Sequence, residues 1–191
     1  MSDWRLARKR LASALLVGLL GCAHAGAPLG PDEVSGSSGH GYALLHEILG
    51  QERQVSELLL IKTERRPLEV VIDAIADTCD TAYDRLDELA AEKPRLDLAD
   101  NGLPADEVLT RRAIAATRRD QLLAASGREF ELQLLWSQNE ALSYASHLAD
   151  TLARSETEPA RLAFVRALWK DLVRRDEEVQ ALLRRSAGSG G

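Results

Sequence analysis

Apolar residues recur at alternating intervals of three and four over four long segments of the chain, and prolines stand between several of these segments. In the clearest segment, which lies between Pro67 and Pro94, the row consists of Leu68, Ile72, Ile75, Cys79, Ala82 or Tyr83, Leu86 and Leu89. This spacing places the apolar side chains on one face of an α-helix that other helices must cover. Aromatic residues make up only 4% of the chain, which disfavours a β-sandwich or barrel. The pattern predicts an all-α protein.

Three further long helices are predicted from the same period. They extend from Tyr42 through about Glu64, from about Phe130 to near Ser155, and from Pro159 onward. The turn sequence Asn101-Gly102-Leu103-Pro104 precedes one or two shorter helices over residues 105–126. Helices of roughly 20 to 28 residues match the dimensions of a four-helix bundle. We therefore expect an antiparallel four-helix bundle over residues 40–186. The short extra helical segment between the second and third long helices could cap one end or form a crossover.

The first 21 residues have the three parts of a secretory signal peptide. A basic stretch over residues 5–10 precedes an apolar run over residues 11–20, and small residues follow. The run is too short to cross a membrane, because a transmembrane helix needs about 20 apolar residues. Its end, Leu19-Leu20-Gly21-Cys22, resembles the bacterial lipobox, in which the cysteine receives lipid and the signal is removed before it. An ordinary signal peptide cut near Ala23-His24-Ala25 is the alternative.

The charge of the chain agrees with attachment through lipid on Cys22. The formal net charge is −6, and the signal peptide holds four basic residues against one acidic one, so the mature chain is more acidic still. Such a balance argues against a nucleic-acid partner and against adhesion to anionic lipid heads. Acyl chains would supply the anchoring free energy instead. We expect a lipoprotein on the periplasmic face of a bacterial membrane, with Ala23 favouring the outer membrane. Residues 22–39 would form a flexible linker, and residues 187–191 a disordered tail.

The order of several short motifs resembles a known family. These are a helix ending in Leu-Leu-Ile-Lys, a Pro-led acidic helix, Gly-Leu-Pro, Ser126-Gly127 before Phe130, and Glu158-Pro159-Ala-Arg-Leu-Ala-Phe. Over residues 42–184 the chain is similar to the ferritin-like periplasmic domain-of-unknown-function family 4142. The resemblance implies a ferritin-like, exported and stress-related bundle with no established activity. Members often carry histidines at positions that here are Cys79, Leu142 and Arg175, so a ligand role for these residues does not carry over.

No catalytic constellation and no cofactor site is found in the sequence. None of the four histidines stands three residues after a glutamate, so the Glu-x-x-His pairs of a di-iron bundle are missing. The acidic stripe Asp73, Asp77, Asp80, Asp84 and Asp87 is expected to be a solvated helix face. Candidate metal ligands are Asp77, Asp80, Glu140, His147 and Asp150.

Two further residues carry separate expectations. Asp176 falls in the apolar row of the last helix, where a buried carboxylate would need an arginine or hydroxyl partner. Cys79 is the one thiol that remains once Cys22 carries lipid, and its apolar position predicts a buried, unreactive side chain.

Two functions are consistent with these observations. The first is a non-enzymatic bundle, tethered to the membrane, that acts by contact with a protein partner and presents an apolar or mixed surface patch. The second is a metal-binding, ferritin-like domain, which requires the candidate ligands to converge from two helices.

Overall fold

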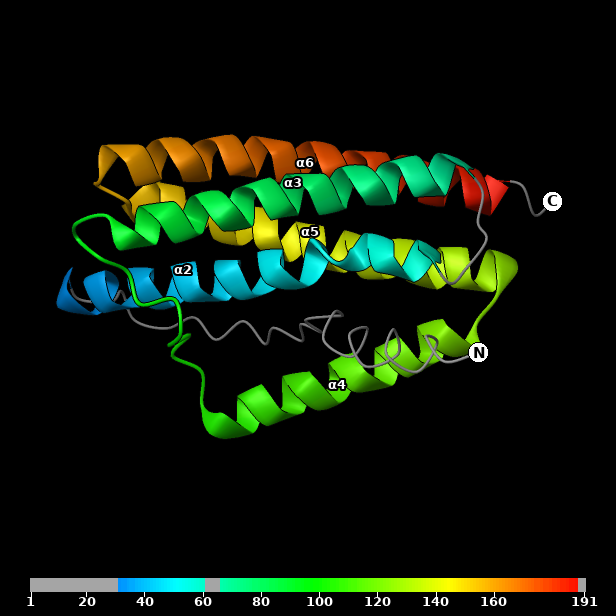
Figure 1. Cartoon of the computed structure of the whole chain (residues 1–191), viewed down its shortest axis with the longest axis horizontal. Coiled ribbons are helices and arrows are strands. Elements are labelled where there is room, and N and C mark those ends of the chain that lie inside the picture. The colour runs from blue at the N-terminus through cyan, green and yellow to red at the C-terminus, as the bar shows by residue number, and fades with distance from the viewer. Residues whose placement is uncertain (1–30, 61–65, 189–191) are drawn as a thin grey trace, which may run out of the picture.

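A computed structural model describes residues 31–60 and 66–188 of the chain. This part is all-helical, with five α-helices, one 3₁₀ helix and no strand (Figure 1). In order, the elements are α2 (Pro31–Glu52), η1 (Val55–Leu60), α3 (Arg66–Ala91), α4 (Ala105–Ala124), α5 (Gly127–Ser155) and α6 (Pro159–Gly188). Within the described residues, no helix is both long enough and apolar enough to cross a membrane. The predicted signal peptide and the predicted lipidation site, Cys22, lie outside the described residues.

Four of the helices, α2, α3, α6 and α5, pack side by side in that order around a shared core (Figure 1). Successive helices along the chain run in opposite directions, so α3 and α5 are parallel and lie on one diagonal of the bundle. Helix α4 lies along the outer side of the bundle, connects α3 to α5 in the chain, and contacts mainly α5 (Figure 1). The extra segment therefore forms a crossover, and it is a single helix of 20 residues rather than a short segment.

The apolar rows seen in the sequence face the core. In α3 the whole predicted row is buried, including Ile72, Ile75, Cys79 and Leu86. Phe130, Leu134 and Leu142 of α5 and Val165, Leu172 and Val179 of α6 complete the interior. Two close approaches of α2 require glycine: a Cβ atom on Gly41 would lie 2.9 Å from Leu152, and one on Gly50 would lie 2.9 Å from the ring of Tyr83.

Three boundaries differ from the sequence prediction. At the carboxy-terminal end, α6 continues through Gly188, so residues 187 and 188 are helical rather than part of a disordered tail. Helix α2 begins at Pro31, so residues 31–39 are helical rather than a flexible linker; proline favours a first helical turn, and two acidic residues follow it. The first long helix also ends at Glu52 rather than near residue 64. Backbone hydrogen bonds there shorten to a span of three residues, as from Gln54 to Gln51, and η1 follows. The 3₁₀ helix still holds Val55 and Leu58 in the core.

A buried ion pair holds together four segments at one end of the bundle. The side chains of Glu156 and Arg161 are only 7% and 8% exposed, and their Oε2 and Nε atoms lie 2.9 Å apart. Tyr42 of α2 donates a 2.7 Å hydrogen bond to the same carboxylate. Arg161 also donates to the backbone carbonyl of Pro94, after α3, at 2.8 Å. The pair therefore ties α2 and the chain after α3 to the α5–α6 turn.

The surroundings of Glu156 make its ionised form the stable one. Burial by itself would raise its pKa, but hydrogen bonds from Arg161, from the backbone of Glu158 and from Tyr42 outweigh burial and lower the pKa to about 2. The folded state therefore holds this carboxylate more strongly in its charged form than the unfolded chain does.

Replacing Glu156 with glutamine is expected to lower the free energy of unfolding by about 3 kcal/mol at neutral pH, because Arg161 then stays buried without a counter-charge. The deficit should be complete above the ordinary carboxyl pKa, about 4.5, and should shrink as the pH falls toward 2. Urea unfolding of the wild type and the variant between pH 2 and 7 measures the size of this deficit and its dependence on pH. As a control, Asp171→Asn breaks an exposed pair with Arg174 and should change stability by less than about 1 kcal/mol. If the two variants lose equal stability at neutral pH, the prediction that the buried Glu156–Arg161 pair contributes more than an exposed pair is wrong.

Candidate functional site

The five candidate metal ligands lie on two helices that do not pack against each other. Asp77 and Asp80 are on α3, whereas Glu140, His147 and Asp150 are on α5, across the diagonal of the bundle. Within residues 31–60 and 66–188, no three His, Cys, Asp or Glu side chains are grouped so that they could hold a metal ion. Metal binding by the five candidate residues therefore stays a prediction, because the described structure does not bring them together as a group of ligands.

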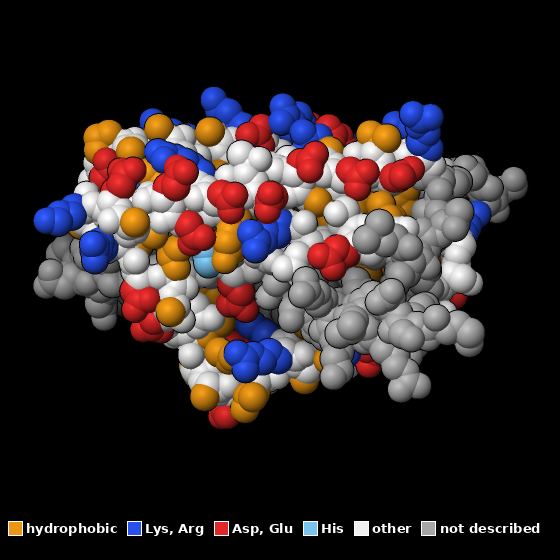
Figure 2. Space-filling model, viewed as in Figure 1, with side chains coloured by type: hydrophobic (Ala, Val, Ile, Leu, Met, Phe, Trp, Pro, Cys, Tyr) orange, Lys and Arg blue, Asp and Glu red, His pale blue; other side chains and the backbone are white. Residues whose placement is uncertain are grey.

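Most of these candidates have other partners at the surface. Asp80 lies 3.5 Å from Arg53, Glu140 pairs with Arg118 of α4, and Asp150 pairs with Arg154 one turn away. His147 is exposed, and its Nδ1 atom lies 2.7 Å from the carbonyl oxygen of Ser143. The remaining members of the acidic stripe on α3 are likewise exposed, as predicted for a solvated face (Figure 2).

Asp176 differs from the prediction in the kind of partner it has. Its two carboxylate oxygens accept hydrogen bonds from the amides of Asn139, at 2.7 Å, and Gln180, at 2.9 Å, rather than from an arginine or a hydroxyl. Burial raises the pKa of Asp176, and the two amide hydrogen bonds oppose the shift. This half-buried carboxylate joins α5 to α6 and has a structural role.

A groove runs along the seam between α3 and α6. Its first hollow has a volume of about 460 Å³ and lies between residues 74–85 of α3 and residues 164–175 of α6. A second hollow, of about 450 Å³, follows on the same seam between residues 66–71 and 178–185. We call the two hollows together the α3–α6 groove.

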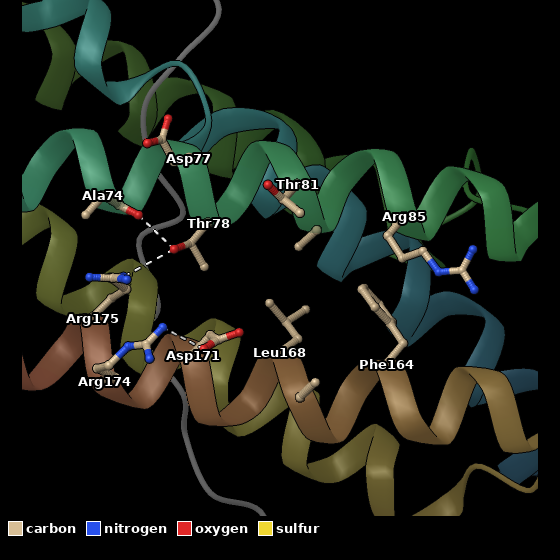
Figure 3. A pocket seen from close by; sticks show the side chains of 12 residues that line it. Ala74, Asp77, Thr78, Thr81, Arg85, Phe164, Leu168, Asp171, Arg174 and Arg175 are labelled. Atoms are coloured by element: carbon tan, nitrogen blue, oxygen red, sulfur yellow. Dashed lines mark hydrogen bonds and ion pairs between the residues drawn. The ribbon is translucent and has the colours of Figure 1, made fainter.

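Small side chains create the first hollow. Ala74, Thr78 and Ala82 on α3 and Ala167 on α6 leave space where longer residues would close the seam. Phe164 and Leu168 project from α6 into this space and give it apolar walls (Figure 3). In the second hollow the apolar lining comes from Pro67, Val70, Val71, Ala181 and Leu182. Val70 is among the most exposed large apolar residues, at 59%.

Charged residues form the rim of the groove. Arg175 stands where the two hollows meet: it donates to the hydroxyl of Thr78 across the seam at 3.2 Å and pairs with Glu178 at 2.7 Å. Farther along, Arg174 pairs with Asp171 at 2.7 Å (Figure 3). An apolar floor with a rim of both signs is typical of a protein-binding surface rather than of a catalytic pocket.

Signals of this groove in the sequence are indirect. Asp77 and Arg175 stand out only as single residues, whereas the hollow depends on the small residues of two helices that are about 90 positions apart in the chain. The signal that could have found it is the run of alanine and threonine beside the apolar row of α3.

Comparison of the chain with protein-family models, with curated proteins and with solved structures finds no match. The resemblance to the ferritin-like family 4142 therefore stays a prediction.

Cys79 is buried among apolar neighbours, as predicted, with 1% of its surface exposed. Burial, together with the nearby carboxyl group of Glu52, raises the pKa of its thiol. In a Cys22→Ser background we expect native protein to react with a thiol reagent at least about 100 times more slowly than urea-unfolded protein. Adding the exposed Thr81→Cys supplies a fast-reacting control. Labelling of native Cys79 at the rate of the control would show that the interior opens readily.

Proposed function

We propose that this protein is a bacterial lipoprotein, held at a membrane through Cys22, whose helical bundle binds a protein partner through the α3–α6 groove. The groove is the observation that carries the proposal, because it combines two apolar hollows with a charged rim. The basic start, the short apolar run and the Leu19-Leu20-Gly21-Cys22 sequence support the lipid anchor. Together they favour a non-enzymatic protein that recruits or positions a partner on the periplasmic face of the membrane, with the outer membrane favoured.

A ferritin-like arrangement of the bundle forms part of this proposal. Parallel diagonal helices, α3 and α5, joined by one long crossover through α4, agree with the connection pattern of ferritin-like folds. The metal-binding or stress-related alternative, in contrast, draws no support from the positions of the five surface candidates.

The shape of the groove favours a helical partner segment. Its two hollows follow each other along two packed helices, so an amphipathic helix laid along the seam can place successive apolar side chains in them. Arg66 and the carboxylate of Asp77 flank the hollows and can pair with charges beside such an apolar face.

Site-specific photocrosslinking in the native host tests the contact. A benzophenone amino acid at Ala167, an exposed position in the groove, is expected to give one discrete adduct on irradiation. The same amino acid at Ala113, an exposed alanine of α4, is the matched control and should give none. Adding Ala74→Trp, which places an indole in the first hollow from a half-buried position, should reduce the Ala167 adduct at least about fivefold. An adduct at Ala113 alone, or at neither position, would remove the support for the groove.

The anchor has its own test. Growth with an alkyne fatty acid is expected to label the wild-type protein and the Cys79→Ser variant, but not Cys22→Ser. The amino terminus of the mature wild type should be blocked at Cys22. A free amino terminus beyond Ala25, or label that persists in Cys22→Ser, would favour an ordinary secreted protein instead.

A further inference from the structure

Three polar side chains from three different helices are buried together in the bundle. Glu52 ends α2, Cys79 lies in the middle of α3, and Gln138 lies in α5; their exposed fractions are 2%, 1% and 0%. All three stand in rows that are otherwise apolar. Such positions are costly for polar groups unless their hydrogen-bonding capacity is used.

Glu52 lies close to each of the other two side chains. Arg53 pairs with Asp80 on the surface, so the residues immediately before them, Glu52 and Cys79, occupy the same level of the α2–α3 seam. The carboxyl group of Glu52 acts on the thiol of Cys79 and contributes to its raised pKa. The amide of Gln138 faces the Glu52 carboxyl group closely enough to lower its pKa, although the two do not meet standard hydrogen-bond geometry.

The polar atoms of this cluster are not satisfied by the protein. Among the described residues, Oε2 of Glu52 and both amide atoms of Gln138 have no hydrogen-bond partner, and Oε1 of the adjacent Gln51 has none either. No ion pair joins Glu52 to an arginine, a lysine or a histidine of the described chain, in contrast to Glu156. Burial raises the pKa of Glu52 to about 7, with Gln138 opposing. The interior thus contains unused oxygen donors and a carboxylate without a counter-charge.

We propose that this interior cluster binds one divalent transition-metal ion of the zinc class, through a carboxylate oxygen of Glu52, the thiolate of Cys79 and the carbonyl oxygen of Gln138. The two anionic donors balance a charge of +2, which leaves the buried site neutral. The thiolate favours zinc-like ions over calcium or magnesium, which take oxygen ligands. One of the three donors is an amide, so the site differs from a cluster of His, Cys, Asp and Glu ligands, and none of the surface candidates takes part.

Binding must release protons. The ion replaces the thiol proton of Cys79 and any proton on the carboxyl group of Glu52, and these protons pass to the solvent.

The test is titration of the full-length chain, purified in detergent and freed of metal, with Zn²⁺ alone and Co²⁺ alone. We expect one ion per chain, and for Co²⁺ a near-ultraviolet thiolate-to-metal absorption band. Cys79→Ser should abolish the band, and Glu52→Gln should weaken binding at least about tenfold. Asp80→Asn, which removes an exposed carboxylate next to Cys79 in the chain, is the matched control and should bind as the wild type does.

Circular dichroism of each variant checks that the bundle is intact, and Gln138→Leu provides a second interior variant because leucine fits an apolar row. Less than stoichiometric binding, cobalt without a thiolate band, or equal loss in Asp80→Asn and Glu52→Gln would each overturn the proposal. If fewer than one ion binds per chain, a proton alone neutralises the carboxyl group of Glu52. Because none of these readouts involves a protein partner, their failure leaves the groove proposal unaffected.

Discussion

The buried ion pair between Glu156 and Arg161 is the interaction on which the arrangement of the bundle depends. A charged pair this far from solvent is tolerated only when its remaining hydrogen-bonding groups are satisfied. Here Tyr42 and the carbonyl of Pro94 provide the additional contacts, and each comes from a different part of the chain. The apolar rows allow the helices to slide along one another with modest loss, whereas this network has one register. It therefore fixes the middle of α2, at Tyr42, and the chain after α3, at Pro94, relative to the α5–α6 turn.

The sequence predicted where the helices lie more accurately than it predicted where they begin and end. The intervals of three and four, together with Pro67, Pro104 and Pro159, located the helices because periodicity and proline act locally. The ends of α2 were wrong, since Pro31 initiates a helix in a stretch of small polar residues and the change to a 3₁₀ helix after Glu52 preserves the apolar period. Whether the segment after α3 caps the bundle or crosses it depends on which helices pair, and local patterns do not contain that information.

The candidate sites show the same division between local and tertiary information. Carboxylates such as Asp80 and Glu140 were selected by spacing, but they lie on outer faces of diagonal helices and pair with arginines instead. The α3–α6 groove exists because alanines on two distant helices face each other. Glu52 and Gln138 had a visible signal, because each interrupts an apolar row at a core position: Glu52 lies between Leu49 and Val55, and Gln138 between Leu134 and Ala141. Polar residues inside apolar rows are therefore more informative here than charged stripes beside them.

The crossover through α4 divides the molecule into two helical hairpins, α2–α3 and α5–α6. In the α5–α6 hairpin residues 156–158 connect the helices, and in the α2–α3 hairpin residues 53–65, which include η1, connect them, so each helix pairs with a partner that is near in sequence. The interface between α5 and α6 is the most extensive one among the described elements. The two hairpins meet along two seams, α2 with α5 and α3 with α6. The architecture thus resembles two small helical subunits that associate on one tether.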